Sequence, residues 1–246
     1  MNKILALVAC LSVGAMAAPI EIGKNANEQS LQQILDSITV GGVSSIDVQK
    51  HQLSFDEVWT NTATGGSVAT FIIEVAGNAS TNAFGIYDIY SDSKLEVFAG
   101  KHTAGTQATI SFLHDGTVYV YGAGIAGDTA IFKSNLFGFY LETANNGIFY
   151  SQADKNADGI DHMVAFQGNG KDKVKITPFA AGTWSTNEYI LAWEDLPAFA
   201  SGFDGDYQDL VVMVESVEAV PEPATLSLIG IGLVTMLSSG MIRRKR

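Results

Sequence analysis

The sequence predicts an all-β body, an antiparallel β-sandwich or jelly-roll-like fold over residues 43–217, with one short amphipathic helix before it. Runs rich in Val, Ile, Phe and Tyr recur about every ten residues, which is typical of a body built from many short strands. Glycine is also frequent, with 25 of 246 residues. No long helical pattern separates the runs, which argues against a parallel α/β sheet.

The start of the chain has the features of an export signal. Lys3 supplies a positive charge, Ile4–Val13 is apolar but too short to span a bilayer, and Ala15-Met16-Ala17 offers a cleavage site between small residues. We therefore expect residues 1–18 to be a signal peptide. The alternative is a lipoprotein, with Leu7-Val8-Ala9-Cys10 as the processing box. Because this cysteine is the only one in the chain, removal of the signal leaves a body without disulfides.

Residues 19–42 are expected to form a linker and a short helix over Glu28–Ile38. Asn27 is the expected N-cap, and Gly41-Gly42 would stop the helix. The apolar stripe at helical spacing is Leu31, Ile34, Leu35 and Ile38.

The strand predictions follow in chain order from the apolar runs. Two polar glycine-containing segments, His114-Asp115-Gly116-Thr117 and Asn145-Asn146-Gly147, are predicted turns between strands. The predicted strands are Gln52–Trp59, Ser67–Val75, Phe84–Tyr90, Leu95–Phe98, Gln107–Leu113, Val118–Tyr121, Leu136–Thr143, Gly147–Ser151, His162–Phe166, Val174–Thr177, Tyr189–Glu194 and Leu210–Val217.

Aromatic residues recur within these strands. Phe84-Gly85-Ile86-Tyr87 resembles Phe137-Gly138-Phe139-Tyr140, either through duplication of a half-domain or through chance recurrence. The larger aromatic side chains could fill the core or form a carbohydrate platform, and the core is the usual place for them. They include Trp59, Phe139, Trp184 and Trp193.

The charge of the body limits its partners. Residues 19–242 contain 9 basic and 26 acidic residues, which gives a formal charge of −17. Such a body is unsuited to nucleic acid or to anionic lipid, because phosphate groups would be repelled. It is compatible with cation binding or simply with a soluble, acidic surface.

One acidic segment has the spacing of a metal-binding loop. Oxygen-bearing side chains alternate at Asp154, Asn156 and Asp158, and Gly159 in the sixth position permits a sharp bend. The carbonyl of Ile160 and the side chain of Asp161 are further candidate ligands. Calcium prefers such an all-oxygen shell, so the spacing predicts a calcium site.

The segment departs from an EF-hand calcium loop in two ways. Its flanks have the pattern of strands and not of helices, and its twelfth position is Ala165, where an EF-hand has a glutamate. The remaining ligands must come from elsewhere in the chain. We expect the two acidic segments to share one or two calcium ions, unless both are only polar surface turns. The candidate ligands outside the loop are Glu194, Asp195, Asp204, Asp206 and Asp209.

Motifs for catalysis are few. The chain has four histidines but no nucleophile elbow, no zinc-binding histidine pair and no phosphate-binding loop. Asp158 and Asp161 lie near His162 and could act as acid and base, but a cation loop explains them more simply. We therefore expect a protein that is not an enzyme.

Residues 218–246 have three parts in a fixed order. Pro221-Glu222-Pro223 comes first, Leu226–Ile242 is an apolar stretch at the short end for a membrane span, and Arg243-Arg244-Lys245-Arg246 is a basic end that should stay cytoplasmic. This tail resembles the PEP-CTERM sorting signal of Gram-negative bacteria. An ordinary C-terminal anchor would give the same topology.

The resemblance implies recognition by an exosortase and a link to exopolysaccharide and biofilm. It also implies a body that lies in the periplasm while the tail spans the inner membrane, and at the cell surface or in the extracellular matrix after processing. A second resemblance, over Phe137–Val217, is to the domain of unknown function 4114. It rests on Phe137-Gly138-Phe139-Tyr140, Asn156–His162, Trp193–Leu196 and Asp204–Val212. That family implies secreted β proteins without an assigned activity.

The sequence therefore predicts an exported surface or matrix protein with a calcium-stabilised β domain. The alternative is a carbohydrate-binding module that engages exopolysaccharide through exposed aromatic side chains and the acidic loops.

Overall fold

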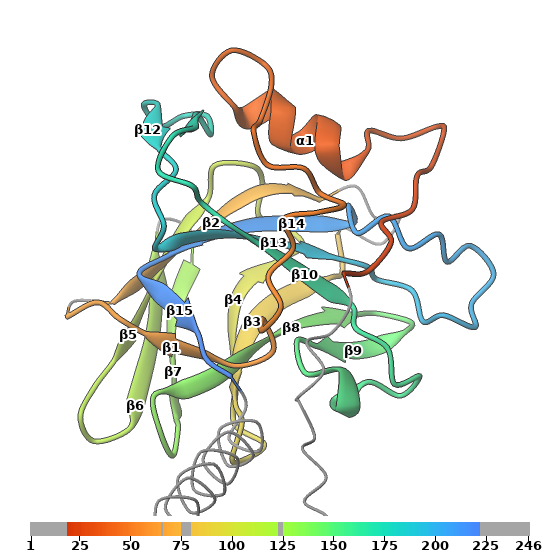
Figure 1. Ribbon diagram of the computed structural model, residues 1–246. Coiled ribbons are helices and arrows are strands. Elements are labelled where there is room, and N and C mark those ends of the chain that lie inside the picture. Colours follow the sequence, from red (N-terminus) through yellow and green to blue (C-terminus); the bar gives the residue numbers. More distant parts are fainter. Residues whose placement is uncertain (1–18, 65, 75–79, 123–124, 222–246) are drawn as a thin grey trace, which may run out of the picture.

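A computed structural model describes residues 19–64, 66–74, 80–122 and 125–221, and within them the fold is mainly antiparallel β, as predicted (Figure 1). Within these ranges, one α-helix, α1 (Leu31–Ile38), and one 3-10 helix, η1 (Ala153–Lys155), accompany the strands. The strands are β1 (Trp59–Asn61), β2 (Ser67–Glu74), β3 (Ala83–Asp88), β4 (Lys94–Ala99), β5 (Gln107–Phe112), β6 (Thr117–Gly122), β7 (Ile125–Ile131), β8 (Leu136–Thr143), β9 (Gly147–Tyr150), β10 (Met163–Gln167), β11 (Lys173–Val174), β12 (Gly182–Thr183), β13 (Glu188–Trp193), β14 (Leu210–Glu215) and β15 (Val217–Ala219).

Two large sheets form the body. The seven-stranded sheet has the order β10-β13-β14-β2-β5-β6-β7. The six-stranded sheet has the order β15-β1-β8-β3-β4, with β9 also paired to β8. Apolar side chains from both sheets form one continuous core between them, including Trp59, Phe84, Leu191 and Val212. This arrangement is a β-sandwich in which each sheet buries one face against the other.

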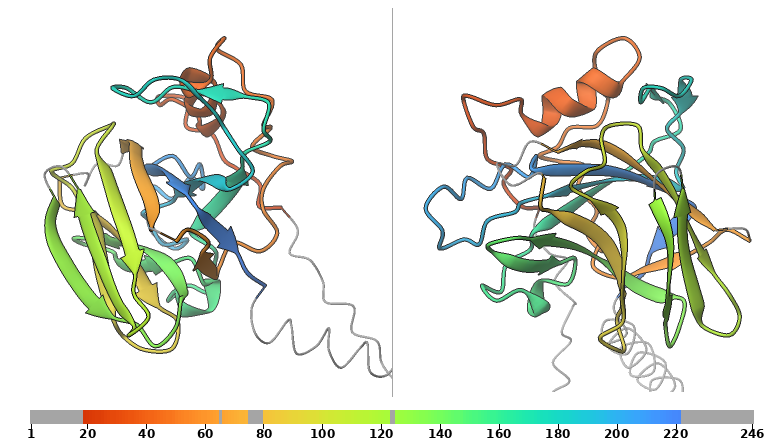
Figure 2. Two further views of the ribbon diagram at one scale, coloured as in Figure 1. Left: turned by 90° about the vertical axis from the view of Figure 1, so that its left-hand side faces the viewer. Right: turned by 180° about the vertical axis from the view of Figure 1, so that it is seen from behind.

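A third layer covers the outer face of the seven-stranded sheet. Figure 2 shows α1 and the small β11–β12 pair on the side of this sheet that faces away from the six-stranded one. A second core lies between them, where Leu31 and Leu35 of α1 meet Phe166 and Ile190. The strand β13 is therefore apolar on both faces, which is why its sequence reads as a continuous apolar run.

The helix begins later than predicted. Ser30, and not Asn27, is the N-cap: its hydroxyl accepts a hydrogen bond from the Gln33 amide (3.4 Å), and the Gln33 side chain accepts one from the Ser30 amide (2.9 Å). This reciprocal capping box satisfies two N–H groups at the start of the helix, whereas Asn27 lies outside it. The helix ends at Ile38, as predicted, but its C-cap is Thr39 in an extended conformation (φ −81°, ψ 129°), so the chain leaves the helix before it reaches Gly41 and Gly42.

Several strand boundaries also differ from the prediction. The run Gln52–Trp59 is mostly irregular, with only Trp59 in a strand, because the Asp56 carboxylate and the Leu53 amide bond to the edge of β10. The predicted strand Leu210–Val217 divides at Ser216, whose φ of +59° turns the chain from one sheet into the other. Val174–Thr177 is reduced to the two-residue β11. The strands β7 and β12 were not predicted.

The recurrence of Phe-Gly-x-Tyr has a local physical reason. The strands β3 and β8 pair so that Gly85 lies opposite Tyr140 and Gly138 lies opposite Tyr87. A Cβ atom at Gly138 would lie 2.4 Å from the Tyr87 ring, and one at Gly85 would lie 2.5 Å from the Tyr140 ring. Each glycine therefore makes room for the other strand's tyrosine.

The four aromatic residues weighed as a carbohydrate platform are core residues. Trp59, Phe139, Trp184 and Trp193 are each fully buried. Trp59 packs edge-to-face against Phe139, with ring centroids 5.5 Å apart. These four side chains cannot contact a glycan in this fold.

Candidate metal site

Sheet pairing brings a first group of carboxylates together. Glu194 and Asp195 directly follow β13, and Asp209 directly precedes β14, its antiparallel neighbour. Because Trp193 pairs with Leu210, the end of one strand lies beside the start of the next. One carboxylate oxygen from each of the three residues lies within 4.8 Å of the other two. All three were predicted as metal ligands, and we call them the Glu194 group.

The hydrogen bonds of this group leave one acidic oxygen without a partner. Asp209 accepts from the Asp195 amide (2.9 Å), and Asp195 accepts from the side-chain amide of Asn82 (3.2 Å). Glu194 accepts one long hydrogen bond, from the Leu196 amide to Oε1 (3.3 Å). Its Oε2 is buried and has no hydrogen-bond partner within the described ranges. A buried acidic oxygen without a partner is costly unless it binds a proton or a cation.

The pKa values of the Glu194 group also indicate that its carboxylates need a proton or a cation. The pKa of Glu194 is raised to about 9, first by burial and then by the charges of Asp209 and Asp204. Burial and the charge of Asp195 raise the pKa of Asp209 to about 7, and burial raises the pKa of Asp195. Among the described residues, no lysine or arginine forms an ion pair with any of the three. The group therefore lacks a compensating positive charge from the described side chains.

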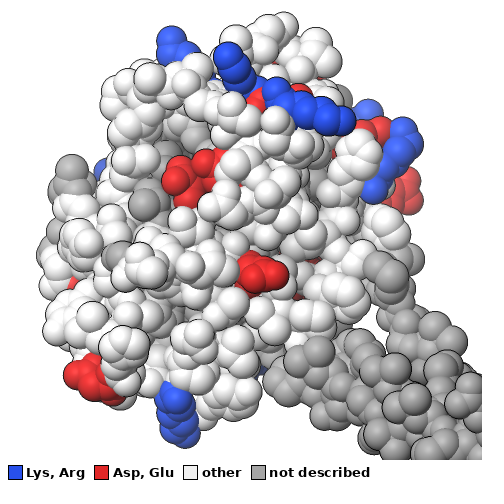
Figure 3. All heavy atoms as spheres, turned by 60° about the vertical axis from the view of Figure 1, so that its left-hand side comes forward, with Lys and Arg blue, Asp and Glu red and all other residues white. Residues whose placement is uncertain are grey.

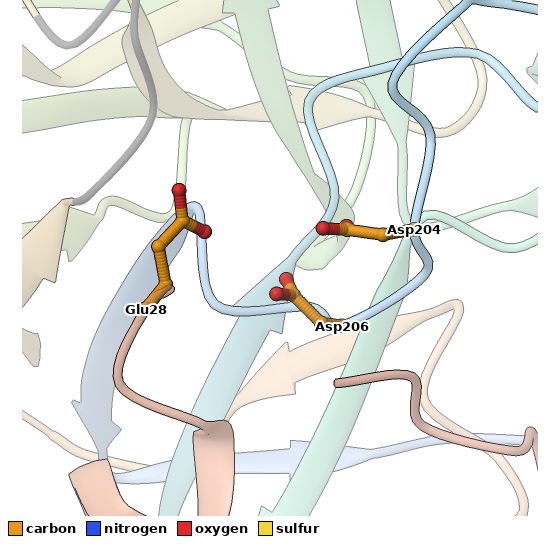
Figure 4. A group of neighbouring side chains, drawn as sticks. All are labelled: Glu28, Asp204 and Asp206. Atoms are coloured by element: carbon orange, nitrogen blue, oxygen red, sulfur yellow. The ribbon is translucent and has the colours of Figure 1, made fainter. Parts of the chain in front are cut away.

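A second group of carboxylates lies at Glu28, Asp204 and Asp206, again with one oxygen from each within 4.8 Å of the others. Figure 4 shows the three side chains turned toward one another from two separate segments of the chain. Asp206 is buried, whereas Glu28 and Asp204 are exposed. Burial and the charge of Asp204 raise the pKa of Asp206 to about 6. We call these residues the Glu28 group.

Gln208 stands in the chain between the two groups. It is fully buried, and its side-chain nitrogen donates to Glu28 (2.7 Å) and to Asp206 (2.8 Å). Its Oε1 is buried without a hydrogen-bond partner among the described residues. The charges of Asp204 and Asp206 also raise the pKa of Glu194. The two groups are thus electrostatically linked.

The predicted loop Asp154–Asp161 is satisfied largely by its own hydrogen bonds. The Asn156 side chain accepts from the Tyr150 amide (2.7 Å) and donates to the Tyr150 and Ile160 carbonyls (3.0 and 2.9 Å). Gly159 makes the predicted bend, with φ of +71°. Neither carboxylate group found among the described residues contains a member of this loop.

The acidic side chains of the loop point to different places. Asp154 is exposed on η1. Asp158 bonds to His162 Nε2 (3.0 Å) and accepts from the Ala198 amide (2.9 Å), so this loop does meet the segment after β13. The structure therefore brings the predicted ligands Glu194, Asp195 and Asp209 together, and it places Asp204 beside Asp206. Asn156 and Ile160, which were also predicted as ligands, instead form a hydrogen bond with each other, from the Asn156 side chain to the Ile160 carbonyl.

Asp161 belongs to a pair that the sequence did not indicate. It accepts from the Met163 amide (3.0 Å), and Asp56 accepts from the Ala165 amide two residues further along β10 (3.0 Å). Burial raises the pKa of Asp161 to about 7, and burial together with the charge of Asp161 holds the pKa of Asp56 well above its usual range. These carboxylates accept hydrogen bonds from amides along the outer edge of β10, whose residues are mostly buried.

Gln208 was missed as a site residue because it stands inside a predicted acidic segment but carries no charge. Three further residues of the site were missed: Glu28, Asn82 and Asp56. Glu28 was placed in the predicted helix and Asp56 in a predicted strand, and Asn82 had no pattern around it. Each joins its partners only through contacts distant in the sequence, such as the 113-residue separation between Asn82 and Asp195.

The fold and the site define an acidic β-sandwich protein with two groups of carboxylates that could hold cations. Residues 103–217 match the model of the domain of unknown function DUF4114, and residues 219–245 match the PEP-CTERM protein-sorting motif. The end of the chain therefore matches the PEP-CTERM sorting signal, and the larger part of the body is similar to the DUF4114 family, as the sequence predicts. The DUF4114 match begins at residue 103, earlier than the predicted start at Phe137, and so includes β5, β6 and β7. Neither the curated proteins nor the solved structures gave a match.

The sorting motif implies an exosortase as processing partner and export to the cell envelope of a Gram-negative bacterium. Within the described ranges, no helix has the length and apolar character that a membrane crossing needs. The signal peptide 1–18, the predicted span 226–242, the basic end 243–246 and two of the three motif residues, Glu222 and Pro223, lie outside those ranges. Pro221 is described, directly after the Val220 amide donates to the Val58 carbonyl (2.7 Å).

Proposed function

We propose that the chain is an exported, non-enzymatic protein whose β-sandwich is stabilised by calcium. The tail holds it in the inner membrane with the body in the periplasm, and exosortase processing then releases the body to the cell surface or extracellular matrix, where it is associated with exopolysaccharide or biofilm. The PEP-CTERM match supports the export and processing steps. The calcium step rests on the Glu194 group.

The observation that carries the calcium proposal is the buried, unpartnered Oε2 of Glu194 beside two further carboxylates. Two buried carboxylates and a half-buried third repel one another, and a divalent cation would neutralise that repulsion. The donors are all oxygen, which favours calcium over zinc or other metals that prefer histidine or cysteine. The side-chain oxygen of Asn82, buried and also without a hydrogen-bond partner among the described residues, is a further ligand candidate.

The proposal of a non-enzymatic role is supported by the surroundings of Asp158 and His162, the acid–histidine pair that the sequence offered as a catalytic candidate. His162 is fully buried, with its ring stacked on Phe149 at a centroid distance of 4.1 Å. Its two ring nitrogens face the Glu194 carbonyl and the Asp158 carboxylate. A substrate could not reach this ring without unpacking the core, so Asp158 and His162 serve the structure.

Thermal unfolding of the purified full chain in detergent tests the calcium proposal. Calcium at about 100 times its dissociation constant should stabilise the native state by about 2.7 kcal/mol relative to excess chelator. For a body of this size, that corresponds to a rise in melting temperature of about 5–10 °C. Glu194→Gln should lose most of the rise, whereas Glu96→Gln, at an exposed position on β4, should keep it. A wild-type melting curve that is identical with calcium and with chelator would refute the proposal.

A second function, glycan binding, is favoured by one exposed face. Tyr119 and Tyr121 project from the same face of β6 with 40% and 50% of their surface exposed. Their cross-strand neighbours include Ser111, Thr109 and Thr129, and Figure 3 shows only scattered charged side chains on the side of the molecule that carries β5 and β6. Aromatic rings among hydroxyl groups suit the apolar faces and hydroxyls of sugars.

Binding of isolated exopolysaccharide, measured by calorimetry, tests this alternative. Tyr119→Ala and Tyr121→Ala should each weaken binding, whereas Tyr90→Ala, at a residue that is 49% exposed elsewhere, should not. Absence of saturable binding by the wild type in calcium would leave the structural role as the function.

A further inference from the structure

The outer face of the six-stranded sheet carries a layer of tyrosine rings. The phenylalanines of β3 and β8 belong to the core between the sheets, so alternation along the strands places the tyrosines on the opposite face. Because Gly138 has no side chain, the ring of Tyr87 lies across β8 and meets Tyr150 of β9 edge-to-face, with centroids 5.0 Å apart. Gly85 likewise leaves room for the ring of Tyr140 over β3. The recurrent Phe-Gly-x-Tyr motif therefore builds an aromatic surface outside the core.

Two lysines stand over this layer of rings. Lys155 comes from η1, which lies beside β9 (Figure 1). Its Nζ is 5.6 Å from the centroid of the Tyr87 ring and 6.0 Å from that of Tyr150. Lys94, the first residue of β4, places its Nζ 5.2 Å from the centroid of the Tyr140 ring. These cation–π contacts position both ammonium groups on the aromatic surface.

The charges of the two ammonium groups are only partly compensated. Among the described residues, no carboxylate lies within ion-pair distance of Lys155, and the partner of Lys94 is Glu142 (3.6 Å), whose side chain is half exposed. Residues 19–242 contain 9 lysines and no arginine against 26 acidic residues. A place that two lysines share therefore differs from the rest of this acidic body and suits an anionic group.

The two lysines share one pocket of about 420 Å³, a volume in the range of small-molecule sites. Its lining residues are Tyr87, Ser91, Asp92, Lys94, Tyr150 and Lys155. Tyr150 is half-buried, so part of its ring is open to a ligand, and Asp92 is exposed and can accept hydrogen bonds. The pocket thus combines cations, an aromatic ring and a hydrogen-bond acceptor.

We propose that this pocket binds a carboxylate-bearing sugar of an acidic polysaccharide. The ammonium groups of Lys94 and Lys155 bind its carboxylate groups, the ring of Tyr150 contacts the apolar face of the sugar, and sugar hydroxyls donate to Asp92. A neutral sugar would leave both lysines without an anion, and a simple phosphate would not use the aromatic ring. This inference rests on the proposed association with exopolysaccharide and adds to it a site and a chemical class.

Calorimetric titration of the purified full chain in detergent, at one fixed calcium concentration, tests the inference. The probe is trigalacturonate, a short chain of sugar acids, and maltotriose is the uncharged control of equal length. The wild type should bind trigalacturonate saturably and maltotriose at least about tenfold more weakly, because only the acid pairs with the lysines. Lys94→Gln and Lys155→Gln should each weaken trigalacturonate binding about tenfold, since each removes a charge-assisted hydrogen bond. Lys101→Gln, at an exposed position beyond the opposite end of β4, should not weaken it.

Two further variants separate this pocket from the other proposed sites. Glu194→Gln should bind trigalacturonate as the wild type does, because the pocket uses no bound calcium. Tyr119→Ala should do the same, because it lies on β6 of the other sheet. Lys155 is exposed, so its variant should fold, and a melting temperature equal to that of the wild type would verify this.

The possible outcomes distinguish this inference from the function on which it rests. Trigalacturonate binding that both lysine variants leave unchanged, or equal affinity for maltotriose, would overturn the inference. If the wild type binds isolated exopolysaccharide but not trigalacturonate, and both lysine variants bind exopolysaccharide equally well, the inference fails while the association with exopolysaccharide stands. Absence of binding to both would overturn the inference and the association together.

Discussion

The Asp154–Asp161 loop and the Glu194 group differ in what their sequence and their geometry indicate. The loop has the alternating spacing of a calcium loop, yet Asn156 and Asp158 bond to nearby amides, carbonyls and a histidine. The Glu194 group has no motif, yet it gathers three carboxylates and leaves one buried oxygen without a partner.

This difference shows that two properties of a candidate metal site are separate: the spacing of ligand residues in the sequence, and the presence of side-chain oxygens that have no hydrogen-bond partner in the fold. Aspartate and asparagine suit tight turns because their side chains bond to the local backbone, and the same residues suit metal loops. Spacing alone cannot distinguish the two uses. An acidic oxygen that remains without a partner after folding is the more direct indication of a missing cation.

The largest expected effect is the pH dependence of stability without calcium. In the fold the carboxyl pKa values are raised, to about 9 for Glu194 and about 7 for Asp209, above those of the unfolded chain. The native state then binds more protons than the unfolded state, so this contribution to stability is complete below about pH 4 and is lost as the pH rises through 7 toward 9. Urea unfolding in chelator should show a fall on the order of 3 kcal/mol between pH 5 and pH 8.

Calcium should reverse this trend, because the ion competes with protons for the same oxygens and binds better at higher pH. The same unfolding experiment with saturating calcium is therefore the control. A free energy of unfolding in chelator that stays constant or rises from pH 5 to pH 8 would contradict the prediction. It would mean that the Glu194 group has no uncompensated negative charge and does not differ from the Asp154–Asp161 loop in this respect.

The next effect concerns the loop. Asn156→Ala removes a buried side chain, 5% exposed, that makes three hydrogen bonds to the Tyr150 and Ile160 backbone. We expect a loss of about 1–3 kcal/mol in the free energy of unfolding, equal in calcium and in chelator. Asn135→Ala, at an exposed position, should cost little under either condition. A loss seen only in calcium would show instead that the loop binds the ion.

The fold could be predicted where local pattern and tertiary contacts agree. The strand β8 has the predicted bounds, and the Asp115-Gly116 turn joins β5 and β6, with the Asp115 carboxylate accepting from the Thr117 amide. The strand β7 was missed because Ile125–Ile131 contains glycine, alanine and aspartate and forms the sheet edge. The break at Ser216 depends on a single positive φ that no residue type indicates.

The site could be predicted only in part, for the same reason. Glu194, Asp195 and Asp209 flank strands that the sequence predicts, so their approach follows once the two strands are paired. Glu28 joins Asp206 through Gln208, which is 180 residues away from it in sequence. Such a contact depends on how the N-terminal segment packs against the finished sheet, and no local pattern encodes it.

The smallest expected effect, that of Asp154→Ala, most directly tests whether the Asp154–Asp161 loop or the Glu194 group binds the metal. Asp154 holds the first position of the spaced loop, where a calcium loop would have its first ligand. In the structure it is exposed on η1, so Asp154→Ala should change the free energy of unfolding by less than about 0.5 kcal/mol. It should also leave the number of bound calcium ions unchanged, because neither carboxylate group among the described residues includes it. Loss of an ion in this variant would return the metal to the loop and reverse the assignment made from geometry.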